Sequence, residues 1–392
     1  MPSPDETAAS APRVTSPSSV TTATEAEPGV KALEKSGQPG EEVTAVEGGE
    51  GEAVTGATGE FSAYPSDLEA GTDTSDSNTD RDDDSALGTS VRNSTVSLRS
   101  SIYEYMEENG RTYHAYNSGK YMLPNDEREQ DRLDLQHHSF RIMLDGKLGL
   151  APIKSPQRVL DLATGTGIWA IEFAQEHTES TVIGTDLSPI QPPFVPPNCK
   201  FEVDDAENEW NFSEPFDYIH ARAIVTCFKN NRAMVQKIFD NLKPGGYFEF
   251  QDPCFPMLSD DKTLDGTALH EWNTLMVESM SRIGRNLKDS QNWGRYMKDV
   301  GFVDVTETRV YVPVNPWAKG KKNKMLGIIS YQNMSEGIAS LSTAAFTRIL
   351  GWDQSRLEVF LTKVREDLGN KNVHAYGIVY FVHGRKPEET KT

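Results

Sequence analysis

The 392-residue sequence has little cysteine, since it contains only three such residues. Cys199, Cys227 and Cys254 are scattered and form no CxxC pair, which excludes a disulfide framework and predicts reduced thiols. The eight histidines show no HxxxH or HExxH spacing, so the sequence predicts no metal site. No stretch approaches the roughly 20 apolar residues of a membrane helix, and the first residues lack a secretory signal pattern. We therefore expect no membrane association and a location in the cytoplasm or nucleus.

Basic residues are also scarce, because 39 Lys and Arg stand against 59 Asp and Glu, giving a formal net charge of −20. Residues 1–100 alone carry 19 acidic and 6 basic side chains. They are rich in Ser, Thr, Gly, Pro and Ala and contain few large apolar side chains. Such a segment cannot bury enough apolar surface to offset its ordering entropy, so we expect a disordered acidic tail. The acidity also argues against direct electrostatic binding of nucleic acid.

From Gln157 onward, short apolar stretches alternate with helical patterns. This alternation predicts an α/β fold in which helices cover both faces of a mostly parallel sheet. The five expected strands of this part are RVLDLA (158–163), TVIGTDL (181–187), CKFEVDD (199–205), FDYIHARA (216–223) and GYFEFQD (246–252).

Two later stretches alternate apolar and polar residues, FVDVTETRVYVPV (302–314) and HAYGIVYFVHGRK (374–386). They predict an antiparallel pair of strands with a helical insertion between them, at about residues 316–370. Residues 101–155 are rich in aromatic side chains and then helical in pattern, which predicts an N-terminal helical cap. The main domain is expected to cover residues 156–392.

The stretch RVLDLATGTGIWA, from Arg158 to Ala170, carries the first chemical signal. It reads as a strand, a turn of small residues and a helix N-terminus, an arrangement that cradles nucleotide-like ligands. A phosphate-binding P-loop is excluded because no lysine follows Gly167. GTGIWA matches the dinucleotide pattern GxGxxA, and Asp186 lies 19 residues past Gly167, where a carboxylate can bind ribose hydroxyls. The motif alone fits either a dinucleotide or S-adenosylmethionine.

The surrounding residues separate these two ligands. Asp161 precedes the loop, where its carboxylate would repel a pyrophosphate but suits a ligand with an ammonium group, or can pin the loop. Asp204, Asp205 and Ala206 follow the third strand, where a carboxylate can accept from an adenine amine. With the sequence LKPGG (242–246) at the start of the fifth strand, the chain resembles class I S-adenosylmethionine-dependent methyltransferases over about residues 157–252.

A narrower resemblance covers nearly all of residues 101–387. The chain is similar to the LaeA-like methyltransferases of fungi in GRTYHAYNSGKYMLPNDEREQDRLDLQHH, GTDLSPIQPPFVPPNCKFEVDDAENEW, FDYIHAR and HAYGIVYFVHGRKP. The resemblance implies a seven-stranded class I, Rossmann-like methyltransferase fold, S-adenosyl-L-methionine as cofactor and a link to secondary metabolism. It also implies either a small-molecule methyl acceptor or a nuclear regulatory role with velvet-type protein partners.

The resemblance implies how the cofactor is held. The two loop glycines would let the backbone approach its methionine part, Asp186 would accept from the ribose, and either Asp204 or Asp205 would meet the adenine. Ala163 stands where the family usually has glycine, at little cost if its backbone φ is ordinary. The expected cofactor-binding residues are Asp161, Ala163, Thr164, Gly165, Gly167, Asp186, Leu187, Asp204, Asp205, Ala206, His220 and Arg222.

Several aromatic and acidic residues have two open interpretations. His220 touches the cofactor's methionine end or substrate, or is a structural histidine, and Trp210 lies against adenine or simply packs. Three tyrosines precede the sheet and form a lid or pack in the core. Glu249 and Asp252 are expected at the end of the fifth strand, as candidate bases on the substrate side. The lid candidates are Tyr113, Tyr116 and Tyr121. No catalytic residue is assigned, because the cofactor supplies the electrophile in methyl transfer.

Overall fold

A computed structural model describes residues 105–108, 110–114, 116–117 and 120–389. The expected disordered tail, residues 1–100, lies outside the described residues. None of the helices in the described ranges is long and apolar enough to cross a membrane.

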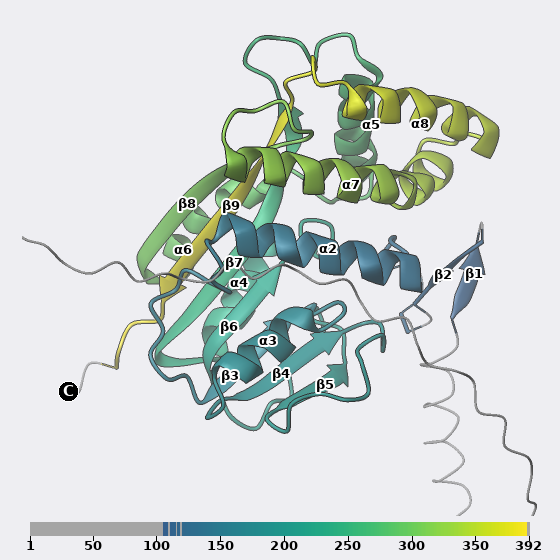
Figure 1. The fold of residues 1–392 in the computed structure, drawn as a ribbon. Helices are drawn as coiled ribbons and strands as arrows, with labels where there is room; N and C mark the ends of the chain where they lie inside the picture. The colour runs from purple at the N-terminus through teal and green to yellow at the C-terminus, as the bar shows by residue number, and fades with distance from the viewer. Residues whose placement is uncertain (1–104, 109, 115, 118–119, 390–392) are drawn as a thin grey trace, which may run out of the picture. The chain divides into compact units, whose positions relative to one another are not determined.

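Seven strands form one sheet in the order β5-β4-β3-β6-β7-β9-β8 (Figure 1). Neighbouring strands from β5 to β7 pair in parallel, and β9 is antiparallel to both β7 and β8. The predicted seven-stranded, mostly parallel sheet is therefore confirmed. The strands are β3 (Arg158–Leu162), β4 (Thr181–Asp186), β5 (Cys199–Val203), β6 (Phe216–Arg222), β7 (Leu242–Leu258), β8 (Val303–Pro313) and β9 (Tyr376–Arg385).

Strand β7 is longer than the sequence pattern predicts. Its parallel pairing with β6 ends at Gln251, but its antiparallel pairing with β9 continues to Leu258. The expected strand end at Asp252 is therefore wrong, because β9 supplies backbone partners beyond the parallel part of the sheet. This places Glu249 and Asp252 inside a strand, where both side chains are fully buried.

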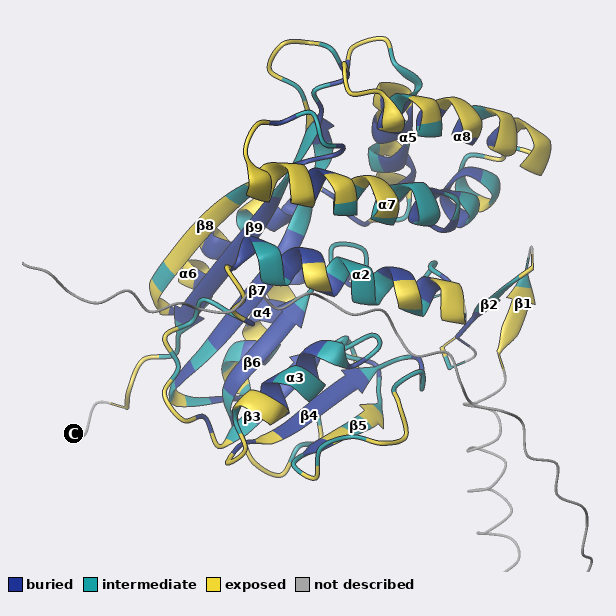
Figure 2. Cartoon of the chain, viewed as in Figure 1, coloured by how far each residue is buried: buried dark blue, intermediate teal, exposed yellow. Residues whose placement is uncertain are grey.

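Helices cover both faces of the sheet, as the alternation of strands and helices predicts. Val159 and Tyr218 pack under α3 (Ile168–Glu176), whereas the next residues along the same strands, Leu160 and Ile219, join the core formed with α4 (Asn231–Asp240) and α6 (Trp293–Val300). Figure 2 shows the buried strands between these layers. Successive side chains of one strand thus belong to two separate cores.

The first described part of the chain, within residues 105–143, is referred to as the N-terminal segment, and its helix lies on the α3 side of the sheet. It begins with a hairpin of β1 (Met106–Glu108) and β2 (Arg111–Tyr113), followed by α2 (Glu127–Met143). Asp126 caps α2 by accepting from the backbone N–H of Glu129, which satisfies one of the free donors of the first turn.

Two long helices lie between β8 and β9, where the sequence predicts a helical insertion. They are α7 (Lys321–Ala344), extended by a π turn over Ala345–Ile349, and α8 (Gln354–Gly369). Helix α7 packs along α2, so these two helices lie side by side on one face of the sheet (Figure 1). Helix α5 (Ala268–Arg282) contacts α8 and the π turn in a separate apolar cluster.

Candidate active site

A cavity of about 1070 Å³, including the part open to solvent, lies at the carboxyl ends of the parallel strands. Open α/β sheets bind their ligands at this edge, in the crevice where the strand order reverses. Here the reversal falls between β3 and β6, whose following residues both line the cavity. Residues from the N-terminal segment and α2 form the opposite wall. We refer to this space as the cofactor cavity.

The glycine loop after β3 is held in a left-handed backbone conformation. Gly165 has φ of +59° and Gly167 has φ of +81°, a region that glycine adopts without steric cost. A Cβ on Gly167 would also overlap the ring of Phe201. Ala163 has φ of +54°, so the condition of an ordinary φ, under which alanine would cost little, is not met. An L-residue in this region carries strain of about 1–2 kcal/mol.

Asp161 pins this loop and does not line the cofactor cavity. Its buried carboxylate accepts from the hydroxyl of Thr164, and its other oxygen lies 2.7 Å from Nδ1 of His220. His220 is stacked on Trp169, with ring centroids 3.7 Å apart, and is fully buried. His220 does not line the cofactor cavity, and its burial and contacts favour the structural interpretation of this residue.

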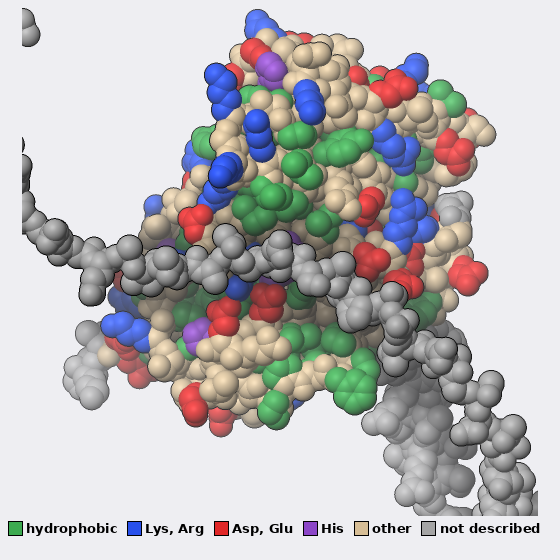
Figure 3. All heavy atoms as spheres, in the orientation of Figure 1, with side chains coloured by type: hydrophobic (Ala, Val, Ile, Leu, Met, Phe, Trp, Pro, Cys, Tyr) green, Lys and Arg blue, Asp and Glu red, His purple; other side chains and the backbone are tan. Residues whose placement is uncertain are grey.

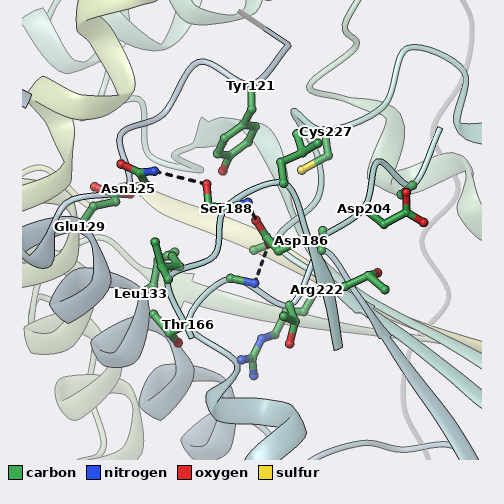
Figure 4. A pocket seen from close by; sticks show the side chains of 18 of the residues that line it. Tyr121, Asn125, Glu129, Leu133, Thr166, Asp186, Ser188, Asp204, Arg222 and Cys227 are labelled. Carbon is green, nitrogen blue, oxygen red and sulfur yellow. Dashed lines mark hydrogen bonds between the residues drawn. The ribbon is translucent and has the colours of Figure 1, made fainter. Parts of the chain in front are cut away.

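Asp186 ends β4 and lines the cofactor cavity. One carboxylate oxygen accepts from the backbone N–H of Gly165 at 2.8 Å, and the other accepts from Ser188 at 2.9 Å (Figure 4). Burial is the main cause that raises the pKa of Asp186 to about 6. Each oxygen keeps a further lone pair, so the carboxylate can still accept from two hydroxyl groups.

Asp204 and Asp205 both line the cavity, but their surroundings differ. Asp204 accepts from the backbone N–H of Asp205, and burial raises its pKa. Asp205 is buried and accepts from the Asn117 amide at 2.9 Å and from the ammonium group of Lys120. Despite its burial, these hydrogen bonds lower its pKa. In this structure, side chains of the N-terminal segment therefore donate hydrogen bonds to Asp205, the more buried of the two carboxylates.

Arg222 ends β6 and lines the cavity. Its guanidinium donates to Nδ1 of His137 at 2.9 Å, while Nε2 of His137 lies 2.9 Å from Glu172. Burial lowers the pKa of Arg222 to about 10 and, with the nearby arginine charge, the pKa of His137 to about 3. The imidazole is thus neutral and joins β6 to α2 and α3 through two hydrogen bonds.

The predicted aromatic residues differ in their position relative to the cofactor cavity. Tyr121 lines the cofactor cavity and points its ring toward the space beside Asp186 (Figure 4). Tyr113 is buried and does not line this cavity. Trp210 packs against the core and donates its indole N–H to the carbonyl of Ala206. The predicted cofactor-binding residues that do line the cavity are Ala163, Thr164, Gly165, Asp186, Leu187, Asp204, Asp205, Ala206 and Arg222.

The expectation that Glu249 faces the substrate is corrected by the structure. Its carboxylate accepts from the backbone N–H groups of Leu150 and Ala151, from the Tyr218 hydroxyl and from the Gln251 amide. It therefore anchors the segment between α2 and β3. Asp252 also does not line the cofactor cavity, and burial raises its pKa well above the usual range. Both positions lie inside the extended β7 and not at its end.

The sequence patterns missed the cavity wall supplied by the N-terminal segment. Asn125, Glu129, Leu133 and Gln136 line the cavity, and nearby Asp134 accepts from Thr166 of the glycine loop at 2.7 Å. The sequence PND (124–126) is typical of a helix start, and the position of that start determines which residues of α2 share one face. Nothing in the local sequence indicates that this face covers the cofactor cavity.

A second cavity of about 1250 Å³, including its open part, adjoins the first. It lies between α2, α7 and the extended ends of β7, β8 and β9, and most of its lining side chains are apolar. We refer to it as the apolar cavity. The two cavities share the residues Tyr121, Leu133, Gln136 and Ala223, which we refer to as the junction.

The cofactor cavity fits S-adenosylmethionine by the chemistry of its donor set. Asp186 offers a carboxylate to ribose hydroxyls, and Asp204 and Asp205 offer carboxylates to an adenine amine. The N-terminus of α3 follows the glycine loop, and its free N–H groups and dipole favour the carboxylate of a methionine moiety. A pyrophosphate would instead face several carboxylates.

Comparisons with known proteins agree with this assignment. A family model described as a methyltransferase domain matches residues 135–307. The chain is 36% identical over 298 residues to methyltransferase pytC of Aspergillus terreus, covering 75% of this chain and 92% of that protein. It is 38% identical over 303 residues to the secondary metabolism regulator laeA of Aspergillus flavus, covering 75% and 81% of the two chains.

Among solved structures, phosphoethanolamine N-methyltransferase 2 of Haemonchus contortus in complex with S-adenosyl-L-methionine matches at 15% identity. The match has a TM-score of 0.39 and covers 77% of this chain and 75% of that chain. The family assignment rests on the relatives at 36–38% identity, which align over most of their own length. The chain belongs to the LaeA-like methyltransferases, a class I family that uses S-adenosylmethionine as methyl donor.

Proposed function

We propose that this enzyme methylates a small-molecule acceptor of fungal secondary metabolism and acts in the cytoplasm or nucleus. The observation that carries the proposal is the junction, where a polar cavity suited to the cofactor adjoins an apolar cavity of similar size. Methyl transfer requires the donor and the acceptor to meet with water excluded. Relatives named as methyltransferase pytC and as secondary metabolism regulators support the biological setting.

Different residues of the cofactor cavity would bind different parts of the cofactor. Asp186 would accept from the ribose, Asp205 or Asp204 from the adenine, and the glycine loop with the start of α3 would hold the methionine part. When bound, S-adenosylmethionine supplies an electrophilic methyl group. Tyr121 would cover this group at the junction, because its ring borders both cavities.

The junction holds no group that is ready to accept a proton at neutral pH. Burial raises the pKa of Tyr121 well above its usual value, which keeps the phenol protonated, and the amide of Gln136 does not titrate. These two side chains can orient an acceptor by hydrogen bonding. The chemistry therefore favours acceptor atoms that attack without first losing a proton to the protein.

The proposal is tested by following the methyl group. The full chain is incubated with radiolabelled S-adenosylmethionine and a small-molecule extract of a strain that lacks the gene. We expect label in an extract-derived metabolite, and its unmethylated form should accumulate in the deletion strain. An unchanged metabolite profile together with no labelled product would count decisively against a small-molecule acceptor.

A second candidate function is regulation of secondary-metabolite genes through velvet-type protein partners, with the acidic segment 1–100 as docking arm. It is favoured by the relatives that are named secondary metabolism regulator laeA. The two candidates differ in what gene deletion changes. A regulator would alter transcripts of several unlinked biosynthetic clusters, whereas a tailoring enzyme would alter the chemistry of one product class.

A further inference from the structure

We infer that the apolar cavity is the acceptor site, and that it selects an acceptor whose body is neutral and predominantly apolar. This inference rests on the proposed function, because it assigns a substrate class to the same enzyme. It goes further by placing the acceptor between α2 and α7 and by excluding acceptors that carry a charge away from the reacting atom.

The lining of the two cavities differs most in charge. Six charged residues line the cofactor cavity, whereas Arg132 is the one charged residue among the described residues that line the apolar cavity. An unpaired charge buried in such surroundings would lose its hydration without compensation, at a cost of several kcal/mol. A charged acceptor body would therefore bind poorly in the apolar cavity.

Arg132 is already neutralised by its neighbours. Its guanidinium donates to Glu129 at 2.9 and 2.6 Å and to the side-chain oxygen of Asn333 at 2.9 Å. Arg132 and Glu129 are both buried, so this pair is shielded from solvent. An anionic ligand would have to compete with Glu129 for the guanidinium. The single cation of the lining is therefore a link between α2 and α7 and not an anion site.

The apolar walls come from elements that the sheet edge and the insertion bring together. Phe140 and Met143 line the cavity from α2, and three methionines line it from other elements. They are Met334 of α7, Met257 of β7 and Met276 of α5. Methionine side chains are flexible and polarizable, so such walls adapt to ligands of somewhat different shape. The lining thus favours an extended hydrophobic molecule over a small polar one.

The position of the cavity also fits an acceptor site. It borders the cofactor cavity at the junction, whose neutral polar groups are the hydroxyl of Tyr121 and the amide of Gln136. A heteroatom of the acceptor can be oriented there while its apolar body remains between α2 and α7. The acceptor therefore presents a single polar end to the cofactor.

Two fluorescent probes of the same ring system test the chemical class. N-phenyl-1-naphthylamine is neutral, and 8-anilino-1-naphthalenesulfonate adds one negative charge. Each is titrated into the full chain saturated with S-adenosylhomocysteine, so that the cofactor cavity is filled. We expect micromolar binding of the neutral probe and binding of the sulfonate that is at least about tenfold weaker. Equal affinity for the two probes would overturn the inference.

Two variants test the location. Met334→Trp and Ile329→Trp each place a larger side chain in the apolar cavity from α7, and neither position lines the cofactor cavity. The matched control is Met325→Trp, because Met325 lies on the solvent side of the same helix and is 49% exposed. Figure 3 shows hydrophobic side chains at the surface over α7. We expect at least tenfold weaker binding of the neutral probe to both cavity variants and no change in the control.

Calorimetric titration with S-adenosylhomocysteine separates the two possible failures. Retained binding shows that the variants are folded and that the cofactor site is intact. If the wild-type chain binds the neutral probe but no S-adenosylhomocysteine, the proposed function fails while the apolar site stands. If it binds S-adenosylhomocysteine, and both cavity variants bind the neutral probe like wild type, the assigned acceptor site is overturned and the proposed function stands.

Discussion

The cofactor cavity and the apolar cavity meet at four residues, yet the chain builds them in different ways. The polar walls of the first come largely from loops that follow β3, β4 and β5, within residues 163–206. The walls of the second come from α2, from the ends of β7 to β9 and from α7, which are far apart in the sequence. Under the proposed function, donor recognition therefore depends on short contiguous motifs, whereas acceptor recognition depends on how distant elements pack.

The largest expected effect separates the two cavities. Asp186→Ala removes a carboxylate of the cofactor cavity, and with it the acceptor for the backbone N–H of Gly165 and the proposed acceptor for two ribose hydroxyls. Each hydrogen bond to a charged group contributes about 1.5–3 kcal/mol, so we expect at least a hundredfold loss of S-adenosylmethionine affinity. Calorimetric titration of the full chain measures it.

Binding of N-phenyl-1-naphthylamine is the control for Asp186→Ala, since Asp186 does not line the apolar cavity. We expect that affinity to remain at the wild-type value in the absence of cofactor. If Asp186→Ala lost affinity for both S-adenosylmethionine and N-phenyl-1-naphthylamine, Asp186 would support the whole fold. That result would contradict the expectation that the two cavities bind their ligands independently.

A somewhat smaller effect decides which carboxylate meets the adenine. We expect Asp205→Ala to weaken S-adenosylmethionine binding by about tenfold or more and Asp204→Ala to weaken it less, because Asp205 is the more buried acceptor. Lys120 and Asn117 contact Asp205 in this structure, so adenine would take the place of one of them. Titration of both variants with adenosine and S-adenosylmethionine measures the difference, and a larger loss in Asp204→Ala would reverse the assignment.

Acidification should weaken ligand binding in the cofactor cavity and not in the apolar cavity. Burial raises the pKa of Asp186 to about 6, and the ionised form is the one that would accept from both ribose hydroxyls under the proposed function. As pH falls through 6 the carboxyl gains a proton, so we expect about tenfold weaker cofactor binding at pH 5 than at pH 7. The raised pKa also means that this group's contribution to folding stability is largest below 3.8 and is lost as pH rises through about 6.

Neutral-probe binding supplies the matching measurement for this pH dependence. The apolar cavity contains no described residue that titrates between pH 5 and 7, so its affinity for N-phenyl-1-naphthylamine should not change. A cofactor affinity that is flat over the same interval would show that Asp186 stays ionised in the protein.

The cofactor cavity was largely predictable because its residues follow strands in a fixed order. The carboxyl ends of parallel strands lie at one edge of a sheet, so Asp186 and Asp205 had to lie near Gly165 once the strands were assigned. His220 and Glu249 were harder, because alternation along a strand gives the face of a residue but not its partner. His220 pairs with Asp161, and Glu249 pairs with backbone N–H groups of the segment before β3.

The apolar cavity could not be predicted because no local pattern specifies it. Its helix α7 follows β8, and its strand ends exist only because β9 pairs with β7 as far as Leu258. Apolar residues such as Met276 and Met334 give the same signal whether they fill a core or line a cavity. That distinction depends on the packing of elements more than 100 residues apart.

The smallest expected effect concerns the backbone of the glycine loop. Ala163→Gly relieves a left-handed conformation that costs an L-residue about 1–2 kcal/mol, but glycine loses about 0.5–1 kcal/mol more entropy on folding. We expect a net gain of about 0.5 kcal/mol, measured by urea unfolding. Ala223 at the junction has the same φ of +54°, so Ala223→Gly should give a similar gain if strain is the cause. A loss of stability in Ala163→Gly alone would show instead that its methyl group contributes through packing against the neighbouring core.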